Sequence, residues 1–177
     1  MFKKLTVIPE LCCGCGICEL VCAIEHFGVN NPKKAAIRVM NTYPHPVVRM
    51  PVVCSQCREP PCAEVCPTDC LQWIDGVVKL DDEDCISCYK CVEACPFGAM
   101  YAHGDCELPI KCDMCGGDPK CVQKCPTDAL RLIPAGVLGE TKRLNNVLSY
   151  TQMKEIEFYE KGEKKTIQYA DIGKEEL

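Results

Sequence analysis

The chain has 177 residues, a formal charge of −5 and 19 cysteines, but only one tryptophan. Hydrophobic residues make up 47% of it with cysteine counted and about 36% without, which is below the apolar norm of a globular domain. Such a chain forms one or two small domains whose thin core needs another component. Its acidity disfavours nucleic acid as a partner, because nucleic-acid binding requires a basic face.

The first expected element is a strand over residues 5–8. It follows Met1-Phe2-Lys3-Lys4, which lacks the apolar segment of a secretory signal. No run of about 20 apolar residues could cross a membrane. We therefore expect the protein in a reducing cytoplasm.

Sixteen cysteines fall into four runs, each with three cysteines close together and a fourth after three intervening residues. The first and third runs have the C-x₂-C-x₂-C-x₃-C spacing that binds [4Fe–4S] clusters in bacterial ferredoxins, which predicts four clusters and transfer of electrons between them. The runs are Cys12, Cys15, Cys18 and Cys22; Cys54, Cys57, Cys62 and Cys66; Cys85, Cys88, Cys91 and Cys95; and Cys112, Cys115, Cys121 and Cys125.

The spacing also predicts how each run is used. Three cysteines on a tight loop can face one cluster, whereas the fourth, expected at the start of a short helix, points to another. Three of the fourth cysteines are followed by proline, which fixes φ and turns the chain away, at Cys66, Cys95 and Cys125. Cys22 is followed by Ala23 instead.

Two other uses of cysteine fit the sequence less well. A secreted disulfide scaffold requires a signal peptide and is awkward with an odd number of cysteines. Zinc sites prefer C-x₂-C pairs separated by a longer gap. Four clusters with sixteen thiolates would instead bring the total charge to about −13, which favours partners with basic rims.

Residues 28–51 form an expected linker with several prolines and a short strand over 35–40. Asp75-Gly76 between two apolar stretches predicts a hairpin that joins the second run to the third. Residues 50–102 are therefore expected to form one complete two-cluster unit. By elimination, residues 1–49 and 103–140 form a second, discontinuous unit around it.

The predicted fold class is thus α+β, with two bacterial-type two-cluster ferredoxin units in tandem, one inserted into the other, plus a C-terminal tail. In each unit the fourth cysteine of one run joins the first three of its partner run. The expected ligand sets are Cys54, Cys57, Cys62 and Cys95; Cys85, Cys88, Cys91 and Cys66; Cys12, Cys15, Cys18 and Cys125; and Cys112, Cys115, Cys121 and Cys22.

The composition changes in the tail, residues 141–177, which has no cysteine and many charges. Residues 155–159 and 166–169 alternate in polarity on either side of Lys161-Gly162, which predicts a terminal hairpin. Two interpretations stay open for this tail: a solvated segment, or an arm that docks on a partner.

The order and spacing of the runs resemble the four-cluster iron–sulfur subunits of the dimethyl sulfoxide reductase type. Such subunits are also found with formate dehydrogenases, hydrogenases and carbon monoxide dehydrogenases. The resemblance covers roughly residues 5–135, is most specific in segments 54–62 and 85–91, and supports the pairing of the outer runs. It implies an electron wire between a catalytic subunit and an external donor or acceptor.

The fourth run, residues 112–121, looks like that of the small polyferredoxin subunits of tungsten aldehyde oxidoreductases and of tungsten-dependent benzoyl-CoA reductases of strict anaerobes. The resemblance implies a large catalytic oxidoreductase subunit, of a tungsten or molybdenum pterin enzyme, and a ferredoxin or flavin-containing partner. Two alternatives stay open: a free-standing polyferredoxin, and the iron–sulfur subunit of a carbon monoxide dehydrogenase or hydrogenase.

Several residues outside the sixteen ligands have two possible roles. His26 is either structural or tunes a cluster potential through a hydrogen bond. Trp73 either packs structurally in the core or covers a cluster and excludes water. The remaining cysteines are expected to be inert small thiols of the core, and the lysines that flank the fourth run are either solvated or steer a carrier. These residues are Cys13, Cys70 and Cys106, and Lys111, Lys120 and Lys124.

The sequence contains no acid–base pair, nucleophile arrangement or phosphate-binding glycine loop. A cluster held by four cysteines leaves no iron open to a substrate. We therefore expect no catalysis by this chain alone.

Overall fold

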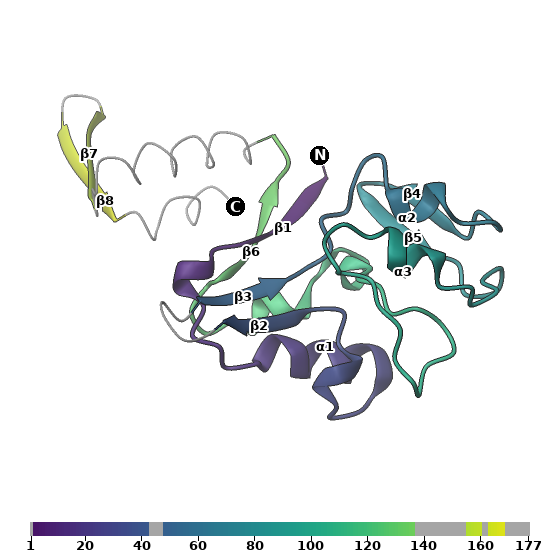
Figure 1. The fold of residues 1–177 in the computed structure, drawn as a ribbon. Coiled ribbons are helices and arrows are strands. Elements are labelled where there is room, and N and C mark those ends of the chain that lie inside the picture. Colours follow the sequence, from purple (N-terminus) through teal and green to yellow (C-terminus); the bar gives the residue numbers. More distant parts are fainter. Residues whose placement is uncertain (1, 43–47, 137–154, 161–162, 169–177) are drawn as a thin grey trace. The chain divides into compact units, whose positions relative to one another are not determined.

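The computed structural model describes residues 2–42, 48–136, 155–160 and 163–168. The chain divides into two compact units, one over residues 2–132 and one that begins at Ile133. The first unit contains short helices and two-stranded sheets, and the described residues of the second include a two-stranded sheet (Figure 1). None of the helices in the described part of the chain is long and apolar enough to span a membrane.

Short paired strands hold the larger unit together. β1 (Lys3–Val7) pairs with β6 (Leu130–Pro134), β2 (Arg38–Thr42) with β3 (Val48–Val52), and β4 (Leu71–Ile74) with β5 (Val77–Leu80). The helices are α1 (Ile17–Phe27), α2 (Pro61–Glu64), α3 (Lys90–Ala94) and α4 (Lys120–Gln123), with 3₁₀ turns at Pro9–Leu11, Pro32–Lys34 and Met114–Gly117.

The region expected to be a linker contains a sheet that the sequence did not predict. The strand expected over residues 35–40 begins instead at Arg38, and it pairs antiparallel with β3, so that Met40 faces Met50. Ala35, Ala36 and Ile37 precede the strand and are buried in the core rather than extended in a sheet. Pro44 and Pro46 lie outside the described residues.

Both hairpins predicted from the sequence are confirmed. β4 and β5 pair antiparallel around Asp75 and Gly76, whose φ angles of 52° and 89° belong to the tight left-handed turn that such a short loop requires. In the second unit β7 (Glu155–Glu160) pairs antiparallel with β8 (Glu163–Gln168). The residues between these two strands lie outside the described part of the chain.

The larger unit has two separate hydrophobic cores. One core joins α1 and α4 through residues that include Cys22, Cys121 and Leu130. The other lies beneath the β4–β5 hairpin and α3 and includes Leu71, Val78 and Cys91. The first core thus collects residues of the first and fourth runs, and the second core collects residues of the second and third runs.

Gly76 provides a test of the hairpin turn. Replacing Gly76 with Ala should destabilise the protein by about 1–3 kcal/mol, because a side chain with positive φ is strained and its Cβ would overlap Phe2, which packs edge-on against Trp73. We expect cluster absorbance to be lost at a lower temperature than in the unchanged protein at the same scan rate under anoxia. Gly104→Ala is the control, since a Cβ there meets nothing within 4 Å. Equal behaviour of the two variants would contradict this account.

Candidate metal centres

Each cysteine run bends through residues in the left-handed region of φ. Gly14 and Gly16 serve the first run, Gln56 the second, and Tyr89 the third, with φ between 46° and 74°. In the fourth run Cys115 itself has a φ of 47°. Left-handed residues reverse the chain over a few positions, so that successive sulfurs and backbone N–H groups face one point.

Sulfurs from two different runs meet in three small cavities. In each cavity three cysteines of one run face the fourth cysteine of another run. In none of these three cavities do all four cysteines come from the same run. The sets are Cys12, Cys15, Cys18 with Cys125; Cys112, Cys115, Cys121 with Cys22; and Cys54, Cys57, Cys62 with Cys95.

The remaining four cysteines of the runs lie around the second core. Cys91 is buried there, with Cys66 and Cys85 packed against it. Cys88 is exposed and lies close enough to Cys91 to raise its thiol pKa, although burial is the larger cause.

The structure corrects where the third and fourth cysteines lie. The third cysteine of each run is on a helix: Cys18 on α1, Cys62 on α2, Cys91 on α3 and Cys121 on α4. The fourth was expected at the start of a short helix, but in three runs it follows the end of that helix, as Cys95 does directly after α3. In the first run α1 is longer and Cys22 lies within it.

The motif Cys-Pro-Thr-Asp has a local hydrogen-bonding function. The Thr68 hydroxyl is 3.7 Å from Cys66 Sγ, and the Thr127 hydroxyl is 3.8 Å from Cys125 Sγ. Cys22 has no such threonine, and the backbone N–H of Ala36 donates to its sulfur at 3.3 Å. Hydrogen bonds of this kind favour the thiolate and tune a cluster that the sulfur holds.

In the three runs that end in Cys-Pro, the third residue after the fourth cysteine has the same left-handed backbone conformation. Asp69, Gly98 and Asp128 have φ angles of 53°, 60° and 52°, and each follows one of the Cys-Pro pairs at the same spacing. This left-handed residue turns the chain back after the proline. The first run lacks both the proline and the turn because α1 continues to Phe27.

Burial and hydrogen bonding shift the pKa values of the cysteine thiols in opposite directions. Burial raises the pKa of Cys18, Cys112 and Cys121 to about 12. Burial also acts to raise the pKa of Cys66, but the Thr68 backbone N–H and the Cys70 thiol outweigh it and lower this pKa to about 7. Since iron binds thiolates, coordination must displace protons from the buried thiols.

The donor set fits iron–sulfur clusters. All nineteen cysteines are free thiols. Soft thiolates in sets of four are the ligands that such clusters require, and the surrounding apolar side chains would shield a cluster from water. A cluster held in this way can accept and release single electrons.

The three cysteines outside the runs differ from one another. Cys70 is 4% exposed, at a position matched by Ala99 and Ala129, and its sulfur is 3.3 Å from Cys66 Sγ. Burial raises the pKa of Cys70 to about 12. Cys13 is exposed and lines the same cavity as Cys12, whereas Cys106 is half-buried against the first core.

Two further side chains contact cysteines or the cores. His26 Nε2 lies 3.5 Å from Cys115 Sγ and 3.4 Å from Asp113 Oδ1, and the hydrogen bond to Cys115 raises the histidine pKa. His26 therefore lies within hydrogen-bonding distance of a cysteine of the fourth run, as one of its two possible roles requires. Trp73 packs against the second core, and its Nε1 is buried without a hydrogen-bond partner.

Gln56 is a residue that sequence reasoning missed. It is fully buried, its Nε2 donates to the Cys112 carbonyl at 2.9 Å, and its Oε1 accepts from the Val78 N–H at 2.8 Å. Lys4 also reaches the Gln56 carbonyl. Gln56 thereby ties the second run to the fourth run and to β5. Its place between two cysteines, where exposure is usual, gave no signal of burial.

The three lysines that flank the fourth run differ in their contacts and exposure. Lys120 forms an ion pair with Asp118 at 2.9 Å, and Lys124 is exposed. Lys111 points inward, and its Nζ is 3.8 Å from Cys54 Sγ. Lys111 is therefore neither fully solvated nor positioned to steer a carrier.

The chain is similar to iron–sulfur proteins of oxidoreductases. It is 37% identical over 134 residues to the polyferredoxin-like subunit of aliphatic sulfonate oxidoreductase from Pyrococcus furiosus, over 73% of this chain and 76% of that one. It is 29% identical over 177 residues to formate hydrogenlyase subunit 2 of Escherichia coli, over 79% and 86% of the two chains.

The chain is also similar to a solved structure. The active site complex BamBC of benzoyl coenzyme A reductase matches with a TM-score of 0.44 and 25% identity, over 83% of this chain and 89% of that one. The model of the 4Fe-4S dicluster domain matches residues 46–134, which include the second, third and fourth cysteine runs. The chain therefore belongs to the 4Fe-4S dicluster domain family.

Proposed function

We propose that the protein is an electron-transfer subunit that carries four [4Fe–4S] clusters and connects a catalytic oxidoreductase subunit to an external electron partner. The observation that carries this proposal is the meeting of three cysteines of one run with the fourth of another in each of three cavities. That crossed arrangement is the ligation of two-cluster ferredoxins. Family membership supports the cluster type.

The proposed ligands are the sixteen cysteines of the runs, in crossed sets. Two sets use the inner runs: Cys54, Cys57, Cys62 with Cys95, and Cys85, Cys88, Cys91 with Cys66. Two sets use the outer runs: Cys12, Cys15, Cys18 with Cys125, and Cys112, Cys115, Cys121 with Cys22. The two separate cores support a division into an inner unit over 50–102 and an outer unit over 1–49 and 103–140.

When bound, each cluster supplies one-electron chemistry between its 2+ and 1+ states. The residues of the chain hold the clusters, exclude water and donate hydrogen bonds to the sulfurs, as Ala36 does to Cys22. Four cysteines per cluster leave no iron open to substrate. The chain therefore conducts electrons and leaves the catalysis to its partner.

The partner is proposed from the relatives. Both are subunits of larger assemblies by name, one of an aliphatic sulfonate oxidoreductase and one of formate hydrogenlyase. We infer a large catalytic subunit with a tungsten or molybdenum pterin centre, a ferredoxin or flavin protein as the other partner, and a cytoplasmic complex of an anaerobe. The β7–β8 hairpin belongs to the segment 141–177 that we assign to docking.

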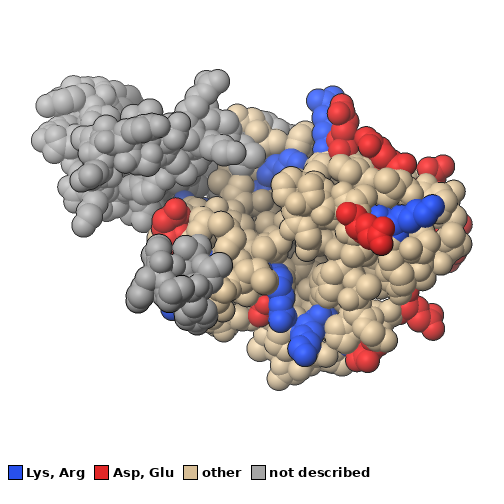
Figure 2. Space-filling model, in the orientation of Figure 1, with Lys and Arg blue, Asp and Glu red and all other residues tan. Residues whose placement is uncertain are grey.

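The surface carries charges of both signs. On the face drawn in Figure 2, basic and acidic side chains are scattered, and several basic ones lie next to acidic ones. With a formal charge of −5 before the clusters are counted, the chain would attract partners whose docking face is basic.

Metal analysis of the native complex, isolated under strict anoxia, tests the proposed function. About sixteen irons for this subunit, together with tungsten or molybdenum, are expected. Nickel in place of tungsten would assign the chain to carbon monoxide or hydrogen chemistry. Iron alone, without a large protein attached, would make it a free carrier and would overturn the subunit proposal.

Pairs of cysteine variants test the crossed ligand sets. Cys15→Ala and Cys125→Ala should each lose about one cluster, and the double variant should lose no more iron, because both residues hold the same cluster. Cys15→Ala with Cys115→Ala should lose about two clusters. Iron and sulfide content of the purified holoproteins measures this. If Cys115 and Cys125 proved to be the non-additive pair instead, each run would hold its own cluster.

Cys12 and Cys13 line the same cavity, and only one of them is expected to be a ligand. Cys12→Ala should remove about one cluster, because Cys12 and not Cys13 completes the C-x₂-C-x₂-C-x₃-C spacing. Cys13→Ala is the matched control and should keep the full iron content. Anoxic iron analysis and the EPR spectrum of the reduced protein distinguish the two. The reverse result would assign Cys13 as the ligand.

The thiol pKa values predict the order in which acid removes the clusters. Burial raises the pKa of Cys22 to about 11 and of Cys112 and Cys121 to about 12, so their pocket favours the protonated thiol and protons compete with iron there first as the pH falls. The site of Cys66, whose pKa is lowered to about 7, has only one thiol with a pKa raised to about 11, Cys91, and should keep its cluster longer than the site of Cys22, Cys112 and Cys121.

Bleaching of the holoprotein after a drop in pH measures this order. The fastest phase should be missing from Cys115→Ala, which lacks the labile cluster, and should persist in Cys88→Ala, which lacks the resistant one. A fast phase that survives in Cys115→Ala and disappears in Cys88→Ala would show that the thiol environment does not set acid stability.

A further inference from the structure

An amino group of the fourth run reaches a cysteine of the second run. Lys111 precedes Cys112 in the chain, but its Nζ lies 3.8 Å from Cys54 Sγ. The same Nζ donates to the Cys112 carbonyl at 2.8 Å and to Gln56 Oε1 at 3.4 Å. An ammonium has three donors, and here all three have acceptors, which fixes its position.

The acceptors around Lys111 do not neutralise it. One is a backbone carbonyl, one is a side-chain amide and one is a sulfur that the proposed function makes a cluster ligand. No ion pair found among the described residues includes Lys111. A positive charge that is half-buried and lacks a carboxylate partner acts strongly on nearby negative charge, because little solvent screens it.

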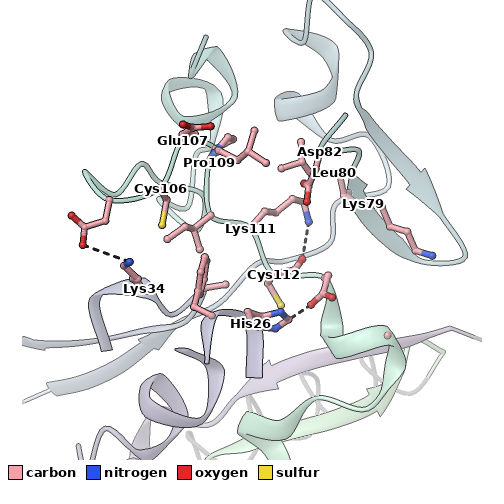
Figure 3. Close-up of a pocket in the computed structure, with 18 residues that line it drawn as sticks. His26, Lys34, Lys79, Leu80, Asp82, Cys106, Glu107, Pro109, Lys111 and Cys112 are labelled. Carbon is pink, nitrogen blue, oxygen red and sulfur yellow. Dashed lines mark hydrogen bonds and ion pairs between the residues drawn. The ribbon is translucent and has the colours of Figure 1, made fainter. Parts of the chain in front are cut away.

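Lys111 lies in the wall of a hollow of about 740 Å³ (Figure 3). Two other basic residues that line this hollow are paired with acidic ones: Lys34 with Asp105 at 3.5 Å, and His26 with Asp113 at 3.4 Å. Figure 3 shows Lys111 hydrogen-bonded to Cys112, apart from both ion pairs. Lys111 thus differs from Lys34 and His26 in that its acceptors include a cysteine sulfur and no carboxylate.

Gln56 connects the two segments that Lys111 contacts, one at Cys54 and the other at Cys112. Its amide bridges the Cys112 carbonyl, the Val78 N–H and the lysine Nζ, and it is fully buried. Lys111 therefore lies where the second and fourth runs approach each other.

We propose that Lys111 raises the reduction potential of the cluster held by Cys54, Cys57, Cys62 and Cys95, and so controls electron passage between the inner and outer units. This inference rests on the four-cluster function proposed above. Reduction adds one negative charge to a cluster, so a nearby ammonium stabilises the reduced state more than the oxidised state. The effect is expected to be largest at this cluster, because the ammonium directly contacts its ligand Cys54.

An anoxic redox titration followed by EPR tests the role of Lys111 in the holoprotein. Lys111→Met should lower the potential of one cluster, with smaller changes at the others, and iron should stay at the wild-type amount. Lys111→Arg keeps the charge and should restore the potential. The signal that shifts should be missing from Cys57→Ala, which identifies the cluster.

Lys34→Met is the matched control, since it removes a positive charge from the same hollow but from a residue paired with Asp105. Its potentials should remain at the wild-type values. Unchanged potentials in Lys111→Met with full iron content would overturn the inference. An equal shift in Lys34→Met would overturn it as well, because any charge of the hollow would then have the same effect.

Cluster loss is distinguished from tuning by a second substitution. If Lys111→Met does not retain iron, the titration is made on Lys111→Gln, whose amide can still donate hydrogen bonds. Loss of iron in both, with retention in Lys111→Arg, would make the charge a structural requirement and contradict a role in potential. Fewer than four clusters in the wild-type protein would refute the proposed function, while the potential of the cluster at Cys54 still reports on Lys111.

Discussion

The crossing of the cysteine runs is the constraint on which the rest of the larger unit depends. Cys125 faces a cavity lined by Cys12, Cys15 and Cys18, although most of the chain separates them. Bringing such distant segments together costs loop-closure entropy. Among the described residues, α1 packs against α4 and β1 pairs with β6, and these contacts offset part of this cost. If the proposed crossed sets bind clusters, the metal–thiolate bonds of each set would join two segments that are far apart in the sequence.

The same constraint explains why so thin a core suffices. Cys18, Cys22 and Cys121 occupy core positions beside Leu5 and Leu130. A buried thiol with a pKa of 11–12 is a small apolar group at neutral pH. In the proposed holoprotein such a thiol would become a thiolate whose charge the metal balances. The same cysteines would then serve both as packing groups of the core and as ligands.

The sequence predicted what depends on local spacing. Asp75-Gly76 indicated a hairpin because a two-residue turn requires positive φ, and both residues have it. The match between Cys66-Pro67-Thr68-Asp69 and Cys125-Pro126-Thr127-Asp128 indicated equivalent turns, and both aspartates share the same φ. The buried position four residues past these cysteines was also predictable, since Cys70 replaces Ala129 there.

What the sequence could not predict depends on contacts between distant segments, and the lysines show why. Lys111, Lys120 and Lys124 have the same charge and similar neighbours in the sequence, so charge and spacing gave them one interpretation. Lys120 is neutralised within its own loop by Asp118. Lys111 reaches a different run because Gln56, buried by its contacts with Cys112 and Val78, holds an acceptor in place for it. The effect of a charge on a cluster is set by its acceptors, and these are a property of the fold.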